Sequence, residues 1–167
     1  MDEAHVAEAP AAIDESLWGF VSAAGELFSK SYGIPPMTGR VFGWLLVCDP
    51  PEQTAAQIGE ALGASKGAIS TATGMLVRFG FVDRLRVRGE RADRFRMRPD
   101  TWDNQLRDQG AAAARALIAQ GLEALADAPA ARRARLEELD TFYEWYLGRA
   151  PRLIEEWLEY KRTRRTK

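Results

Sequence analysis

The sequence contains little of the chemistry on which most enzymes and metal sites depend. Its 167 residues include one cysteine, Cys48, and one histidine, His5. One cysteine cannot form an internal disulfide, and nothing in the composition indicates secretion. This inventory excludes a conventional zinc site, and it excludes a Ser-His-Asp triad or a Cys-His dyad unless His5 folds back from the tail. We therefore predict no enzyme activity, no catalytic residue, no metal site and no cofactor.

Long hydrophobic runs are also missing. The longest apolar stretch without a charge covers residues 41–48, whereas a membrane-spanning helix needs roughly 20 residues. Residues 1–12 are acidic and alanine-rich, so we expect a disordered tail rather than a secretory signal. The composition, 46% hydrophobic and 28% charged, is typical of a globular protein with a buried core. We expect a cytoplasmic protein without a membrane partner.

The charge is distributed unevenly along the chain, although the formal net charge is only −1. Residues 1–64 carry a net charge of −7, residues 65–98 a net charge of +6, and residues 99–167 none. A short basic stretch of this kind is typical of contact with nucleic acid, although a solvated basic surface gives the same count.

Apolar residues at helical spacing and several capping signals predict a series of helices. Thr54 and Gln57 have the spacing of a capping box, Ser65 can cap the following helix, and Gly63 and Gly80 are helix stops. The residues predicted to face the core are Ile58, Ala61, Leu62, Ile69, Ala72, Thr73 and Leu76. The predicted helices cover residues 13–31, 41–48, 55–62 and 66–79.

After Gly80 the pattern changes from helical to alternating. In residues 81–88 and 94–98 the odd positions are mainly apolar, and the even positions after Val82 are arginine. This alternation predicts a β-hairpin with one buried face, one arginine face and a turn at residues 89–93.

The last third of the sequence predicts two long helices. Pro99 would open a helix of roughly 25 residues. A heptad then predicts a helix–helix seam, with Pro151 causing a kink or a break near Gly148. The two heptad positions are Leu136, Tyr143, Ala150 and Trp157, and Leu139, Tyr146, Leu153 and Tyr160.

Two short helices, a tight turn and a basic hairpin, in this order, predict a winged helix-turn-helix. The second short helix turns a polar face with small residues away from Ile69, which suits a major groove. Its glycines could instead serve close packing. Arg91 at the hairpin tip is the candidate for the minor groove, whereas Arg84 and Arg98 could pair with carboxylates. The predicted DNA-contacting residues are Thr54, Ser65, Lys66, Gly67, Ser70, Thr71, Gly74, Arg78, Arg86, Arg88, Arg91 and Arg94.

The sequence resembles the MarR-type transcriptional regulators, in particular the subgroup of glycine-betaine-synthesis repressors (GbsR-like). The resemblance covers about residues 13–165 and departs from the family at the wing tip, where many members have Asp-x-Arg and this chain has Gly-Glu-Arg-Ala-Asp at 89–93. The matching segments are MTGRVFGWLLV at 37–47, DPPEQ at 49–53, AISTAT at 68–73 and GER at 89–91.

The resemblance implies a mainly α (α+β) fold that forms a homodimer on double-stranded DNA. We expect a disordered tail (1–12), a dimerisation helix (13–36), a winged helix-turn-helix (37–99) and C-terminal dimerisation helices (100–167). The residues expected in the dimer interface are Leu136, Leu139, Tyr143, Tyr146, Leu153 and Trp157.

MarR-type proteins usually respond to a small-molecule effector, and five tryptophans offer aromatic surface for one. Trp18, Trp44 and Trp102 either form an effector site, for example for a quaternary ammonium group, or pack in the core and the interface. Cys48 is either a redox switch or an inert buried thiol.

The predicted function is that of a transcriptional regulator, a repressor, that binds a pseudo-palindromic operator as a homodimer. The alternative is a winged-helix module for protein–protein contact, which would bind DNA weakly and without salt dependence.

Overall fold

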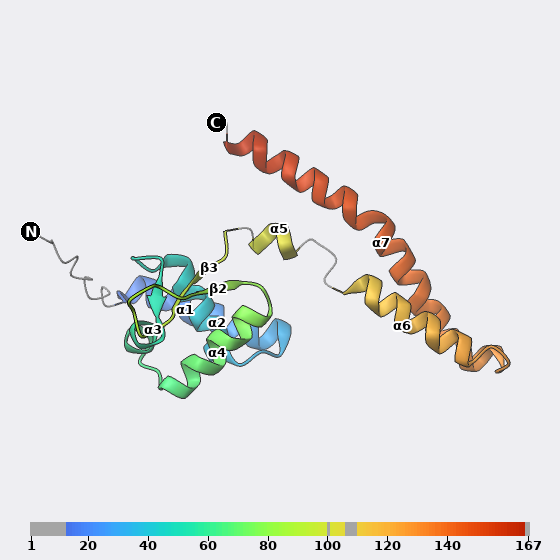
Figure 1. Ribbon diagram of the computed structural model, residues 1–167, viewed down its shortest axis with the longest axis horizontal. Helices are drawn as coiled ribbons and strands as arrows, with labels where there is room; N and C mark the ends of the chain where they lie inside the picture. Colours follow the sequence, from blue (N-terminus) through green and yellow to red (C-terminus); the bar gives the residue numbers. More distant parts are fainter. Residues whose placement is uncertain (1–12, 100, 106–109, 166–167) are drawn as a thin grey trace, which may run out of the picture. The chain divides into compact units, whose positions relative to one another are not determined.

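The structure is a computed structural model that describes residues 13–99, 101–105 and 110–165. The tail at residues 1–12, expected to be disordered, lies outside the described residues. The chain divides into two compact units, one ending at Thr101 and one beginning at Trp102. Figure 1 shows the elements of both units.

The described part of the first unit, residues 13–99, contains four helices and a three-stranded antiparallel sheet with the strand order β1-β3-β2. This is the winged-helix arrangement that the sequence predicts. The elements are α1 (Glu15–Tyr32), α2 (Pro36–Val47), β1 (Gln53–Thr54), α3 (Ala55–Leu62), α4 (Lys66–Arg78), β2 (Val82–Leu85) and β3 (Arg94–Met97).

Local capping fixes where α3 and α4 begin. The Thr54 hydroxyl accepts a hydrogen bond from the Gln57 N–H at 3.2 Å, and the Gln57 side chain accepts one from the Thr54 N–H at 2.8 Å. The Ser65 hydroxyl accepts from the Ala68 N–H at 3.3 Å. Gly63 ends α3 in the left-handed region at φ +59°, where glycine has no steric penalty. Both predicted caps are therefore confirmed.

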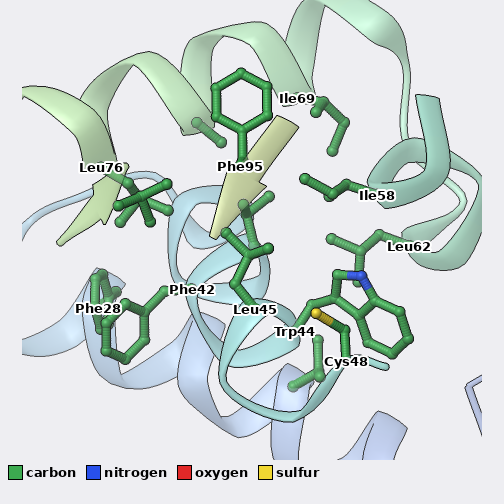
Figure 2. Packing of buried hydrophobic residues seen from close by; sticks show 14 residues of the cluster. Phe28, Phe42, Trp44, Leu45, Cys48, Ile58, Leu62, Ile69, Leu76 and Phe95 are labelled. Carbon is green, nitrogen blue, oxygen red and sulfur yellow. The ribbon is translucent and has the colours of Figure 1, made fainter. Parts of the chain in front are cut away.

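The core of this unit is built from buried side chains of α1, α2, α3, α4, β2 and β3. Figure 2 shows part of it, including Phe28 of α1 and Phe95 of β3. Ile58 and Leu62 of α3 and Ile69 and Leu76 of α4 are buried, and they meet side chains of α2 and Phe95 of β3. Ala72 and Thr73 are buried as well. The core faces predicted for α3 and α4 are confirmed.

The hairpin differs from the prediction because apolar residues of one strand pair with arginines of the other. Leu85 pairs with Arg94, and Arg84 pairs with Phe95. Paired residues on neighbouring strands point to the same face, so Arg84 shares a face with the buried Phe95. The prediction of one buried face and one arginine face is wrong. The loop between the strands covers residues 86–93, and its length pairs odd positions of one strand with even positions of the other.

The second unit is made of α5 (Thr101–Gln105, whose first residue belongs to the first unit), α6 (Ala111–Ala124) and α7 (Ala130–Arg165). The single helix expected after Pro99 is not formed, because Gly110 at φ +110° precedes α6 in a left-handed conformation. α7 continues through Pro151 without a break and is bent (Figure 1). A proline removes one backbone donor and crowds the preceding turn, which bends a helix.

α6 packs against the first part of α7. A Cβ atom on Gly121 would lie 2.9 Å from Leu136 Cδ1, so the two helices approach closely there. Arg115 donates to Asp140 at 2.9 Å and lies 3.3 Å from Glu144. Leu136, predicted for the dimer interface, is thus engaged within its own chain.

Cys48 is a free, buried cysteine at the end of α2. Burial raises the pKa of its thiol to about 11, so the thiol stays protonated at neutral pH. We expect native protein at pH 8 to react with a disulfide reagent about a hundred-fold more slowly than the unfolded chain, because only the thiolate attacks. A stopped-flow thiol titration measures this, and equal rates in native and unfolded protein would contradict the buried placement.

Candidate nucleic-acid interface

α4 separates a buried face from an exposed face along its whole length. Ile69, Ala72, Thr73 and Leu76 are buried, and the Thr73 hydroxyl donates to the Ile69 carbonyl at 2.8 Å. The residues predicted to contact DNA from this helix and its cap are all exposed: Ser65, Lys66, Gly67, Ser70, Thr71, Gly74 and Arg78.

The two helical glycines on this face are not required by packing. A Cβ atom at Gly67 or at Gly74 would meet nothing within 4 Å. Each glycine costs a helix interior about 1 kcal/mol relative to alanine. Close packing therefore does not explain these glycines. Their remaining effect is to keep side-chain bulk off the exposed face of α4.

A cleft of about 1000 Å³ lies between α3, α4 and the hairpin. It brings together four of the predicted DNA-contacting residues, namely Lys66, Ser70 and Gly74 from α4 and Arg91 from the hairpin loop. Arg84, Asp93 and Glu60 line the same cleft. The other predicted residues do not line it: Thr54, Ser65, Gly67, Thr71, Arg78, Arg86, Arg88 and Arg94.

Arginines in the hairpin strands, and Arg98 directly after β3, are paired with carboxylates. Arg84 Nε donates to Asp93 at 2.6 Å, Arg98 Nε donates to Asp83 at 2.9 Å, and Arg96 Nη1 donates to Glu52 at 3.0 Å. The pairing predicted for Arg84 and Arg98 is confirmed.

Arg94, predicted as a phosphate contact, also has a carboxylate partner. Its Nε and Nη2 donate to the two oxygens of Glu90 at 2.8 and 2.9 Å. The hydrogen bond from Arg94 lowers the pKa of Glu90, so this carboxylate stays ionised at neutral pH.

The arginines of the hairpin loop are more exposed than the paired arginines Arg94, Arg96 and Arg98. Arg86 is 83% exposed and lies 3.8 Å from Asp93. Arg88 and Arg91 are exposed, and neither is in an ion pair within the described residues. The loop therefore presents positive charge beside the exposed face of α4.

The three tryptophans proposed for an effector site have different environments. Trp44 is buried in the core of the first unit, at 3% exposure (Figure 2). Trp18 is partly exposed on α1 and carries the Arg40 guanidinium 5.7 Å from its ring centroid. Trp102 is exposed on α5, in the second unit. The first unit thus contains a core tryptophan and a surface tryptophan.

Large apolar side chains remain exposed on α7 and α1. Two residues predicted for the dimer interface, Leu139 and Leu153, are exposed, whereas Tyr143, Tyr146 and Trp157 are partly buried. Trp157 Nε1 donates to Asp103 at 2.7 Å. Exposed apolar residues outside the heptad positions include Phe142 and Trp145 on α7. Those on α1 include Phe20 and Leu27.

The described residues contain no group of three or more His, Cys, Asp or Glu side chains that could hold a metal ion. Of the helices described, none combines the length and the apolar character needed to cross a bilayer.

Comparison with known proteins identifies the family. Residues 100–160 match the model of the MmpR5-like MarR family transcriptional regulators. The chain is 43% identical over 122 residues to the HTH-type transcriptional regulator MmpR5 of Mycobacterium tuberculosis (strain ATCC 25618 / H37Rv), over 72% of this chain and 73% of that protein. The crystal structure of a transcriptional regulator matches with a TM-score of 0.75 at 34% identity, over 86% of this chain and 99% of the other. The chain belongs to the MarR family of transcriptional regulators and is similar to its MmpR5-like members.

Proposed function

We propose that the protein is a cytoplasmic repressor that binds a pseudo-palindromic operator as a homodimer, with α4 in the major groove and the hairpin loop at the minor groove. The observation that carries this proposal is the cleft in which Lys66, Ser70 and Gly74 of α4 face Arg91 of the loop. Phosphates attract the cations, while the small residues leave room for a close approach of the helix.

The proposed DNA-contacting set follows from exposure and pairing. It comprises Ser65, Lys66, Gly67, Ser70, Thr71, Gly74 and Arg78 around α4, and Arg86, Arg88 and Arg91 in the hairpin loop. Thr54 belongs to it as a phosphate donor, because its hydroxyl oxygen accepts from Gln57 and its proton is left to donate. Arg94 would act mainly as the partner of Glu90.

A selection from random DNA, followed by footprinting, tests the proposed operator. The expected result is two inverted half-sites about 10 bp apart, one helical turn, because the two winged units of a dimer face successive turns of one side of the duplex. A single unpaired half-site would contradict the dimeric arrangement. Failure to enrich any sequence would favour the winged-helix module for protein contact.

Gly74→Ala is expected to change stability and DNA binding in opposite directions. The free energy of unfolding should rise by up to about 1 kcal/mol, because alanine is the better helix former and its methyl group meets no atom. Operator affinity should fall, because the methyl group adds bulk to the face that enters the groove. Thermal unfolding and operator titration of this variant measure the two effects, and unchanged affinity would place Gly74 away from DNA.

The exposed apolar side chains of α7 support the homodimer. Leu139, Phe142 and Leu153 lie within about 60° of one another around the helix, so they form one stripe. Exposed apolar stripes of this kind mark interfaces. The proposed dimerisation set also includes Tyr143, Tyr146 and Trp157, with Leu136 shared with α6.

Phe142→Glu tests this interface by sedimentation. The wild type is expected to sediment as a dimer, and the variant should shift toward the monomer because a buried unpaired carboxylate is costly. The matched control is Thr141→Glu, which adds the same charge at an exposed position about 100° around the helix. Equal behaviour of the two variants would remove this stripe from the interface.

We also propose that a small-molecule effector controls DNA binding and that the protein belongs to the glycine-betaine-synthesis repressor subgroup. Trp18 and Trp102 supply exposed aromatic surface, whereas Trp44 could contribute only if the core opened. Release of the operator complex by quaternary ammonium compounds, lost in Trp18→Ala, is the expected result. Release that persists in Trp18→Ala would exclude Trp18 from the site.

A further inference from the structure

The segment that carries Arg91 is tied to the strands at both of its ends. Before Arg91, the two oxygens of Glu90 accept from Nε and Nη2 of Arg94, the first residue of β3, at 2.8 and 2.9 Å. After Arg91, Asp93 accepts from Nε of Arg84 in β2 at 2.6 Å. The four residues Glu90 to Asp93 are thus held by one ion pair to each strand.

These two carboxylates lie in an unfavourable place for a surface that binds DNA. Asp93 lines the cleft together with Arg91, Lys66 and Ser70, and only 14% of its side chain is exposed. A carboxylate beside the phosphate backbone opposes binding by Coulomb repulsion. If the two carboxylates favour DNA binding overall, they must make a favourable contribution to the binding free energy that outweighs this repulsion.

The geometry of the pairs indicates that contribution. Arg94 meets both oxygens of Glu90, and a guanidinium bound in this way fixes orientation as well as distance. Arg84 donates to one oxygen of Asp93. Partly exposed pairs add little to global stability, but they restrict the conformations of a loop that has no strand partner of its own. A loop ordered before binding loses less conformational entropy when it meets its ligand.

We propose that Glu90 and Asp93 are positioning residues for Arg91. Paired with Arg94 and Arg84, they hold residues 90–93 so that Arg91 faces the cleft shared with α4. This inference rests on the proposed DNA-binding function. It assigns to two acidic residues of the wing a favourable role in binding a polyanion.

The sign of the effect of Asp93→Asn and Glu90→Gln on operator affinity tests the proposal. Both changes keep the side-chain size and remove a negative charge. If the carboxylates position Arg91, each variant should bind the operator about five-fold more weakly despite the more favourable charge. The matched control is Glu60→Gln, because Glu60 is exposed in the same cleft and forms no ion pair within the described residues. This control should bind more tightly.

Double variants separate a role through Arg91 from a general effect on the fold. Asp93→Asn should lower affinity in the wild-type background. In Arg91→Ala only the gain from the lost negative charge should remain, so affinity should stay the same or rise slightly. The combination of Asp93→Asn with Arg84→Gln should bind no more weakly than the weaker single variant, since both break one pair. Far-ultraviolet circular dichroism should give the same melting temperature for all of these proteins to within a few degrees.

Three results would overturn the proposal. Tighter binding by Asp93→Asn and Glu90→Gln, as in Glu60→Gln, would show that the carboxylates act only by charge. A loss that persists in Arg91→Ala would show that they do not act through Arg91. Both results leave the proposed DNA-binding function intact. A wild-type protein that does not distinguish its selected operator from competitor DNA would overturn the proposed function and this inference together.

Discussion

Gly39→Ala is expected to lower the free energy of unfolding by about 2–3 kcal/mol. α1 and α2 cross at this glycine so closely that a Cβ atom would lie 2.5 Å from the Ala24 carbonyl oxygen and 2.9 Å from Gly25 Cα. Both are backbone atoms, which cannot rotate away as a side chain can. The added methyl group must therefore push the two helices apart and separate Phe28 from Phe42, whose ring centroids are 4.8 Å apart.

Gly67→Ala is the matched control, because it makes the same substitution in a helix where the methyl group meets nothing within 4 Å. Its free energy of unfolding should rise by up to about 1 kcal/mol. Urea titrations at one fixed protein concentration compare the variants, because apparent stability of a dimer depends on concentration. Equal stability of the two variants would contradict the close crossing of α1 and α2.

Arg91→Ala is expected to weaken operator binding by about ten-fold or more. Arg91 is the cation of the hairpin loop that lines the cleft with Lys66 and Ser70, and no carboxylate neutralises it within the described residues. Arginine in a narrow minor groove meets a concentrated negative potential, and each lost phosphate contact lowers the salt dependence of binding. The slope of log affinity against log salt should therefore become shallower by about 1.

The control for this variant removes an arginine from outside the proposed interface. Arg152 is exposed on α7 and is paired with Glu156 at 2.9 Å, so Arg152→Ala changes the net charge by the same amount. Fluorescence anisotropy with operator DNA should give wild-type affinity for this control. If Arg152→Ala lowered operator affinity as much as Arg91→Ala, the loss would be explained by net charge alone. This result would contradict the docking of the loop on DNA.

The sequence predicts helix starts and core faces correctly where a short-range signal determines them. The capping box at Thr54 and the cap at Ser65 are built from residues three apart. The core face of α4 follows from the period of a single helix. These signals do not depend on which other segment lies opposite, so they fix the helix-turn-helix without knowledge of the rest.

The sequence pattern does not predict how the strands pair with one another. The register that joins Leu85 to Arg94 depends on the loop of residues 86–93, and alternation within each strand cannot reveal it. β1 has only two residues, too few for an alternating pattern, so the sequence identifies Thr54 as a helix cap and a candidate DNA contact but not as part of a strand. The partners of Arg94 and Arg96 include Glu90 and Glu52, and the choice among carboxylates requires the register.

The C-terminal helices show a related limit. The heptad predicts that Leu136 and Leu139 lie in one interface. In the structure Leu136 packs against Gly121 of α6, whereas Leu139 is exposed. A straight helix drifts relative to a strict seven-residue repeat, so one stripe can serve two neighbours. The pattern also omitted Phe142, which is exposed on α7.

Operator recognition can be measured with the wild-type protein and the DNA flanking its own gene, by fluorescence anisotropy across a salt series with excess nonspecific competitor. We expect tight binding whose log affinity falls linearly with log salt, with at least about a thousand-fold preference over competitor at roughly physiological salt. Weak binding that is insensitive to salt and equal to competitor, both for this DNA and for sequences enriched from a random pool, would contradict this expectation.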